Sequence, residues 1–210
     1  MTKKQRALAT VNALKKDYPD AICSLRSDSP LQLLIATRLS AQCTDARVNL
    51  VTPVLFEHFP TLQAFCEASQ DEIAQDIRSC GLYKTKARDI HAMCLKLRDE
   101  FNGKIPDTLE TLTSLPGVGR KTANLMLGDV FGKPAVVADT HCIRISNRLG
   151  LCATKDPLKV ELELKKLLPP EESNDFCHRL VLHGRAVCDA RHPLCDQCSL
   201  LSFCPQVGIK

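Results

Sequence analysis

Lys121 directly follows a short glycine turn, residues 116–120 (Pro-Gly-Val-Gly-Arg), at the expected start of a helix. The turn would present backbone N–H groups on which a phosphate can dock. A helix N-terminus disfavours a charged amine, so the same position would push Lys121 toward its neutral, nucleophilic form. A phosphate site beside a reactive amine indicates chemistry on a nucleic-acid backbone.

The helix after the turn would carry an apolar stripe that does not include Lys121. Ala123, Met126, Leu127 and Val130 recur at the spacing of one helix face. At about 100° per residue, Lys121 lies about 200° from Ala123, so we expect it to face a ligand. The alternative is a structural helix–turn–helix with an exposed lysine, because such units recur in DNA-binding proteins and contact phosphate without catalysis.

Asp139 comes just after a chain breaker, residues 132–134 (Gly-Lys-Pro). One interpretation is that Asp139 simply caps the helix that follows it. The other is that the chain reverses at the breaker and returns the carboxylate to Lys121, where it could deprotonate the amine or stabilise a sugar cation. The two roles can coexist.

Four cysteines lie close together near the C-terminus, at Cys188, Cys195, Cys198 and Cys204. Their spacing, C-x6-C-x2-C-x5-C, in a chain expected to be in a reducing compartment, predicts a metal or cluster site. Four thiolates suit tetrahedral zinc and a [4Fe–4S] cluster alike, so the spacing leaves both open. Because all four ligands come from one short loop, we expect the site to be structural rather than catalytic.

Composition sets wide limits on the partner. The chain has 210 residues with a net charge of +4, which permits a polyanion partner without requiring one. It contains no signal-peptide pattern and no apolar run near the roughly 20 residues that a membrane span needs, so we expect a cytoplasmic protein with no membrane partner. Eight further cysteines occur singly along the chain, and most of them fall on apolar helix faces and are expected in the core. The eight are Cys23, Cys43, Cys66, Cys80, Cys94, Cys142, Cys152 and Cys177.

Nearly every segment has the period of an amphipathic helix, which predicts an all-α fold of about ten short helices. Ser69 and Glu72 form a capping-box pair, and Asp107 with Glu110 repeats that signal. Only residues 135–137 (Ala-Val-Val) look strand-like, and they are too few to start a sheet.

Several runs occur together in the order typical of one known family. They are LSAQCTD at 39–45, GLYKTKA at 81–87, PGVGRKTAN at 116–124, DTH at 139–141, LHGR at 182–185 and the four-cysteine loop. This set resembles endonuclease III, a family of helix-hairpin-helix DNA glycosylases that also act as lyases on abasic sites.

The resemblance implies a monomer of two helical domains with DNA in the cleft between them. A six-helix barrel with the helix-hairpin-helix would occupy residues 23–133. A smaller iron–sulfur domain would combine residues 1–22 with 134–210. Such a chain, of bacterial type, would be associated with the nucleoid.

The resemblance also assigns roles. Lys121 falls on the family's nucleophile and Asp139 on its catalytic acid, while the cysteine spacing matches its [4Fe–4S] loop rather than zinc. Gln42 and Leu82 match residues that fill the gap left by a flipped-out nucleotide; from the residues alone they would be a polar contact between helices and a core leucine. The hairpin residues expected on DNA are Gly117, Val118, Gly119, Arg120 and Lys121.

The implied activity is bifunctional. The enzyme would remove damaged bases, with oxidised pyrimidines expected, from double-stranded DNA and nick abasic sites by β-elimination through a lysine Schiff base. One rival is a relative that only removes mismatched bases, but such relatives lack a lysine at position 121. The other is a DNA-binding module with a structural metal, which would bind abasic DNA without cutting it.

Overall fold

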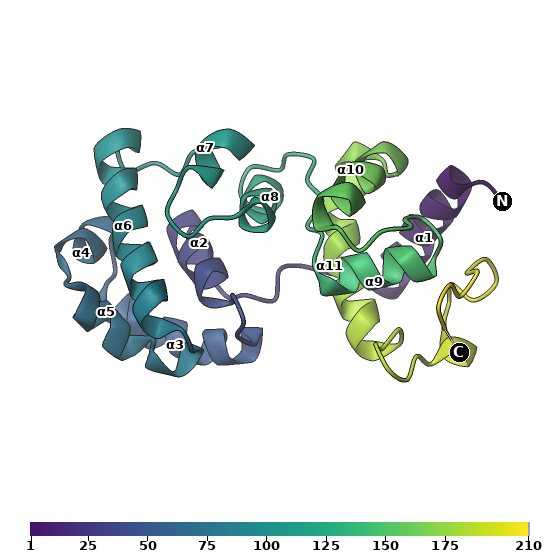
Figure 1. The fold of residues 1–210 in the computed structure, drawn as a ribbon, viewed down its shortest axis with the longest axis horizontal. Coiled ribbons are helices and arrows are strands. Elements are labelled where there is room, and N and C mark those ends of the chain that lie inside the picture. The colour runs from purple at the N-terminus through teal and green to yellow at the C-terminus, as the bar shows by residue number, and fades with distance from the viewer. Residues whose placement is uncertain (210) are drawn as a thin grey trace. The chain divides into compact units, whose positions relative to one another are not determined.

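The structure, a computed structural model, describes residues 1–209 and is helical throughout (Figure 1). Within those residues it has eleven α-helices, three short 3₁₀ helices and no strand. The all-α prediction is confirmed. Residues 135–137 are extended and buried, but they pair with no strand in the described chain.

The chain packs as two compact units. The central unit comprises Ser24–Phe131, and the terminal unit combines Met1–Cys23 with the chain from Gly132 onward. The central unit contains α2 (Pro30–Leu39), α3 (Asp45–His58), α4 (Leu62–Glu67), α5 (Gln70–Asp76), η1 (Arg78–Cys80), α6 (Tyr83–Phe101), α7 (Leu109–Thr113) and α8 (Arg120–Asp129). The terminal unit contains α1 (Lys3–Asp17), α9 (Thr140–Arg148), α10 (Pro157–Leu167), η2 (Pro170–Glu172), α11 (Ser173–Ala186) and η3 (Cys195–Gln197).

The long helix α6 organises the central unit. Its fully buried face includes Ala87, Ile90, Cys94 and Leu97, at the spacing of one helix side. Helices α4 and α5 pack against it, while α2 packs against α8. The core therefore lies along one side of α6.

Capping residues define most helix starts, and one prediction about them was wrong. Ser69 and Glu72 form the predicted capping box of α5. At α7, however, the N-cap is Thr108 rather than Asp107, because the Thr108 hydroxyl accepts the Thr111 N–H at 3.2 Å. A threonine one residue nearer the helix satisfies the orphan amide, so Asp107 is not needed there.

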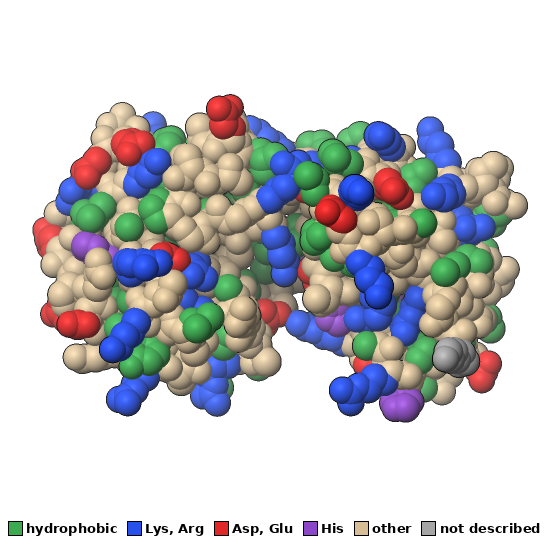
Figure 2. Space-filling model, in the orientation of Figure 1, with side chains coloured by type: hydrophobic (Ala, Val, Ile, Leu, Met, Phe, Trp, Pro, Cys, Tyr) green, Lys and Arg blue, Asp and Glu red, His purple; other side chains and the backbone are tan. Residues whose placement is uncertain are grey.

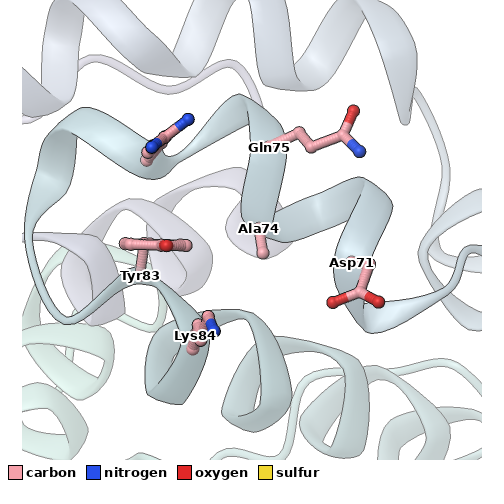
Figure 3. Close-up of a pocket in the computed structure, with 6 residues that line it drawn as sticks. Asp71, Ala74, Gln75, Tyr83 and Lys84 are labelled. Carbon is pink, nitrogen blue, oxygen red and sulfur yellow. The ribbon is translucent and has the colours of Figure 1, made fainter.

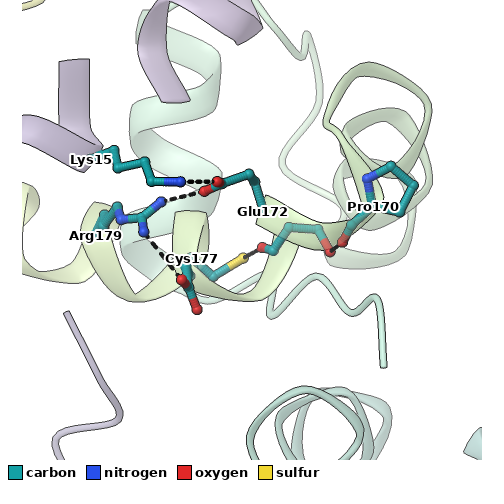
Figure 4. Close-up of polar contacts among 7 residues, drawn as sticks. Lys15, Pro170, Glu172, Cys177 and Arg179 are labelled. Carbon is teal, nitrogen blue, oxygen red and sulfur yellow. Dashed lines mark hydrogen bonds and ion pairs between the residues drawn. The ribbon is translucent and has the colours of Figure 1, made fainter. Parts of the chain in front are cut away.

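In the terminal unit, α11 packs against both α1 and α9. Gly184 permits the second contact, because a Cβ at that position would lie 2.4 Å from His141 Nδ1. At its other end, α11 is tied to α1 by an ionic network (Figure 4). The Arg179 guanidinium, only 4% exposed, donates to Glu172 at 2.7 Å and to Asp175 at 3.1 Å, and Lys15 of α1 pairs with the same Glu172.

Most of the eight isolated cysteines are core residues, as predicted. Six are buried, whereas Cys23 and Cys43 are partly exposed. In the part of the chain that the structure describes, no helix combines the length and apolarity that crossing a bilayer requires.

Candidate active site and cluster loop

Helices α7 and α8 pack together as a hairpin joined by the glycine turn. Gly117 has φ +74°, and a Cβ there would lie 2.7 Å from Arg38 Nε and 2.9 Å from Asp89 Cβ. Only glycine combines that backbone conformation with that space. Gly119 is the N-cap of α8 and has no side chain to cap the first-turn amides, so these N–H groups suit an external oxyanion.

The turn lies on an ion pair that sequence analysis missed. Arg38 of α2 donates from Nη2 and Nε to Asp89 Oδ2 of α6, at 2.7 and 3.1 Å, and both side chains are largely buried. Because Gly117 packs against this pair, the pair sets how closely the turn approaches α2 and α6. Arg38 is the only charged residue of helix α2, which indicates that it has a partner but not which residue that partner is.

Lys121 lies in the first turn of α8 with an exposed side chain. Ala123, Met126 and Leu127 are buried on the other side of the helix, so the predicted orientation of Lys121 is confirmed. Val130, predicted as the last member of that stripe, is the C-cap and only half-buried. The geometry therefore presents the amine to solvent beside the amides of the turn.

Asp139 caps α9 in the terminal unit. Its Oδ1 accepts the Cys142 N–H at 2.7 Å, which confirms the capping interpretation. The extended residues before it are fixed on α11, where Ala135 N donates to Ser173 Oγ and Val137 N to Cys177 Sγ. Capping uses one carboxylate oxygen, so it leaves a catalytic role open.

Gln42 and Leu82 share an uncommon backbone conformation. Gln42 has φ +54° and Leu82 φ +47°, although neither is glycine. Both side chains are exposed, and Leu82 is 59% exposed, so it is not the core leucine that the residues alone suggested. Left-handed backbone at a non-glycine residue costs free energy and is concentrated at functional positions.

A pocket of about 330 Å³ lies at the start of α6 within the central unit (Figure 3). Its lining is Asp71, Ala74, Gln75, Arg78, Tyr83 and Lys84, from α5, η1 and the start of α6. None of the predicted catalytic residues lines it. We therefore assign it no part in the chemistry.

The four clustered cysteines lie in a loop held by two arginines of α9. Arg148 donates to the carbonyl oxygens of Asp189 at 2.6 Å and Ala190 at 2.9 Å, and to Cys188 Sγ at 3.3 Å. Arg144 donates to the Cys188 carbonyl at 2.9 Å. Two guanidinium groups thus fix the start of the loop and supply positive charge beside it.

The thiols of the loop influence one another electrostatically. Burial raises the pKa of Cys198 and Cys204, and the charges of Cys188 and Cys195 raise both further. Across residues 1–209, no three His, Cys, Asp or Glu side chains form a group that could hold a single metal ion. The four sulfurs nevertheless belong to one partly exposed loop, a donor set that suits a soft metal centre.

The surface charge of each unit is mixed. Lys and Arg side chains and acidic side chains both occur on the visible face of each unit (Figure 2). This agrees with the modest net charge of +4. Recognition of a polyanion would therefore depend on local groups such as the hairpin amides.

Comparison with known proteins defines the class first. Residues 35–170 match the HhH-GPD superfamily of base excision DNA repair proteins. The endonuclease III of Synechocystis sp. is 48% identical over 97% of this chain and 94% of its own length. That of Bacillus subtilis is 43% identical over 89% and 86%.

A solved structure shares the whole fold. It is a trapped covalent intermediate of an endonuclease III with DNA, an estranged-adenine complex, with a TM-score of 0.92 and 45% identity over 98% of this chain and 97% of that one. The chain thus belongs to the endonuclease III family within the HhH-GPD superfamily. It is a DNA glycosylase and AP lyase of base excision repair, and DNA is its partner.

Proposed function

We propose that Lys121 is the nucleophile of this enzyme and that its products are a released base and a nicked strand. The observation that carries the proposal is the exposed amine at the N-terminus of α8, beside a turn whose amides suit a phosphate. A related endonuclease III has been trapped as a covalent intermediate with DNA, which is the chemistry an amine nucleophile would give.

In the proposed reaction, the Lys121 amine attacks deoxyribose C1′ and the base leaves with the bonding electron pair. The sugar ring opens to an imine between Nζ and C1′. Loss of a proton from C2′ then expels the 3′ phosphate by β-elimination, and water hydrolyses the imine to free the lysine. A carboxylate or water could release the base, but neither would leave an imine to accept the C2′ electrons.

Asp139 is the proposed acid–base partner. A carboxylate at the start of α9 would accept the amine proton and stabilise positive charge on the sugar. Lys121 lies in the central unit and Asp139 in the terminal unit.

Gln42 and Leu82 are proposed to enter the space that the extruded nucleotide vacates. Their exposure and left-handed backbone support this role, because a strained side chain that faces solvent does not stabilise the core. The turn residues Gly117, Val118, Gly119 and Arg120 are proposed to hold the strand through its phosphates.

For the cysteine loop we propose a [4Fe–4S] cluster bound by Cys188, Cys195, Cys198 and Cys204. The donor set fits: four thiols from one loop, with Arg144 and Arg148 supplying positive charge. When bound, the cluster would fix the path of the loop. We further propose oxidised pyrimidines as the substrate class, and the cytoplasm, where a bacterial chromosome lies, as the place of action.

Borohydride trapping on duplex DNA with one abasic site tests the nucleophile. The wild type should form a covalent adduct, and Lys121→Ala should lose both the adduct and the nick. Lys104→Ala, which removes an exposed lysine of the same unit, is the matched control and should retain both. Nicking by the wild type without any trapped adduct would refute the Schiff-base mechanism.

A further inference from the structure

Lys86 is the only lysine of the described chain that is fully buried, with 0% of its surface exposed. Its ammonium group donates to two backbone carbonyl oxygens, Leu39 O at 2.7 Å and Cys80 O at 2.8 Å. A buried cation is unfavourable unless it is well paired, so these two bonds must compensate for a large loss of hydration.

The two acceptors have a common position in the chain. Leu39 is the last residue of α2, and Cys80 is the last residue of η1. Carbonyls at helix ends lack partners within the helix and carry partial negative charge, so a cation is well placed there. Lys86 therefore joins two chain segments that are 41 residues apart, as counted from Leu39 to Cys80.

Each segment leads directly into one of the left-handed residues. Gln42 follows Leu39 by three residues, and Leu82 follows Cys80 by two. Lys86 itself lies in the first turn of α6, where its own N–H donates to Leu82 O at 3.0 Å. The Lys86 side chain thus anchors both the segment that leads to Gln42 and the segment that leads to Leu82, and the Lys86 backbone N–H bonds to Leu82 directly.

The strain in these loops requires such an anchor. A left-handed conformation at a residue other than glycine persists only where the surroundings determine it. Leu82 has no side-chain capping bond at the start of α6, and both side chains extend into solvent. The fixed points must therefore lie beneath the loops, where Lys86 is.

We propose that Lys86 is a positioning residue for duplex DNA, which holds Gln42 and Leu82 at the spacing needed to fill the vacated site together. This rests on the gap-filling role proposed above for those two residues. Burial lowers the pKa of Lys86, in agreement with a group enclosed by protein rather than one that contacts a phosphate.

The test compares duplex DNA and single-stranded DNA that carry the same abasic site. Only in the duplex does an extruded nucleotide leave a gap opposite a base. On duplex DNA with one abasic site, Lys86→Met should reduce borohydride trapping and nicking about tenfold or more, because displacement of positioned groups by about 1 Å has effects of that size. On a single-stranded oligonucleotide with the same site there is no opposite base to support, and the rate should stay within about twofold. Lys104→Met, a change of equal charge at an exposed site of the same unit, should alter neither.

A double-mutant cycle with Leu82→Ala provides a second readout on duplex DNA alone. If Lys86 acts through the Leu82 loop, the double variant should lose little more activity than the worse single variant. Multiplicative losses, or equal losses on duplex and single strand, would overturn the proposal. If Lys86→Met does not fold, Lys86→Gln, which retains an amide donor for a carbonyl, takes its place in both measurements.

The two proposals fail in different ways. Absence of trapping by the wild type refutes the Lys121 mechanism whatever Lys86 does. A wild type that traps normally, with an unchanged duplex-to-single-strand ratio in the Lys86 variants, refutes only the positioning role.

Discussion

At the scale of single residues, Asp139 combines two functions that substitution can separate. Asparagine caps helices about as well as aspartate, whereas alanine does not. We predict that Asp139→Asn keeps the free energy of unfolding but lowers the rate of base release about 10²–10³-fold through loss of the charge. Asp139→Ala should lose the same activity and in addition about 1 kcal/mol of stability. Denaturant unfolding and single-turnover kinetics on both variants measure this, and an active Asp139→Asn enzyme would leave the residue with its capping role alone.

The sequence predicted single residues well where one helix face decided the outcome. Lys121 faces away from the buried stripe because the 3.6-residue period places it there. The sequence could not predict the ion pair of Arg38 with Asp89 or the carbonyl partners of Lys86, because those contacts join elements that are far apart in the chain. Leu82 shows the same limit: an exposed leucine in a left-handed turn has no local signal that separates it from a core leucine.

At the scale of elements, the hairpin offers two glycines with opposite expectations. Gly117→Ala would force a Cβ within 2.7 Å of Arg38 Nε at a φ of +74°, so we predict a loss of at least about 2 kcal/mol of stability.

Gly119 has φ −90°, and a Cβ there meets no atom within 4 Å. Gly119→Ala should therefore fold normally yet bind DNA more weakly, because the methyl group keeps a phosphate from the amides. Thermal unfolding and binding titrations at two salt concentrations distinguish the cases; equal stability of the two variants would contradict the role of the Arg38–Asp89 contact.

The join between α1 and α11 should depend on pH. Hydrogen bonds from Lys15 and Arg179 lower the pKa of Glu172 below its ordinary 4.5. A carboxyl group whose pKa is lowered by folding stabilises the folded state at pH values above its ordinary pKa. That stability is lost as the pH falls through the lowered pKa. We predict that Glu172→Gln costs about 2 kcal/mol at neutral pH and flattens the loss of stability as the pH falls from neutral to below the ordinary carboxyl pKa of 4.5.

Denaturant unfolding across that pH range provides the measurement for Glu172. Glu171→Gln, the exposed neighbour, is the control and should behave as the wild type does. Identical pH profiles for Glu172→Gln and the wild type would show that the network contributes nothing to stability.

At the scale of the whole molecule, the cysteine loop depends on a helix outside it. Arg148 of α9 donates four hydrogen bonds to residues 188–190. If the proposed [4Fe–4S] cluster is bound, we predict that Arg148→Met loses the visible absorption of the cluster to ferricyanide or a chelator severalfold faster than the wild type, because the loop loses its anchor and its compensating charge. Arg191→Met, on an exposed side chain of the same loop, serves as the control. Unchanged loss in Arg148→Met would mean that the loop is held by its own backbone bonds.

The fold as a whole could be predicted because so many helices begin at recognisable caps. The Ser69–Glu72 pair and the Ser29–Pro30 start both behave as their residue types dictate. Local sequence patterns do not show which distant helices pack together, such as α1 with α10 and α11. That choice depends on interlocking surfaces such as the space at Gly184, which a one-dimensional pattern does not show.

The terminal unit is discontinuous, and this sets an order of events on the ribosome. Helix α1 is synthesised first, but its partners α10 and α11 emerge only after the whole central unit has been made. At about 5–20 residues per second, α1 must wait several seconds with its apolar side uncovered, while the contiguous middle segment can already fold. Nascent chains stalled after residue 131 has left the ribosome, but before α11 has emerged, should therefore contain a protease-resistant core preceded by a protease-sensitive α1.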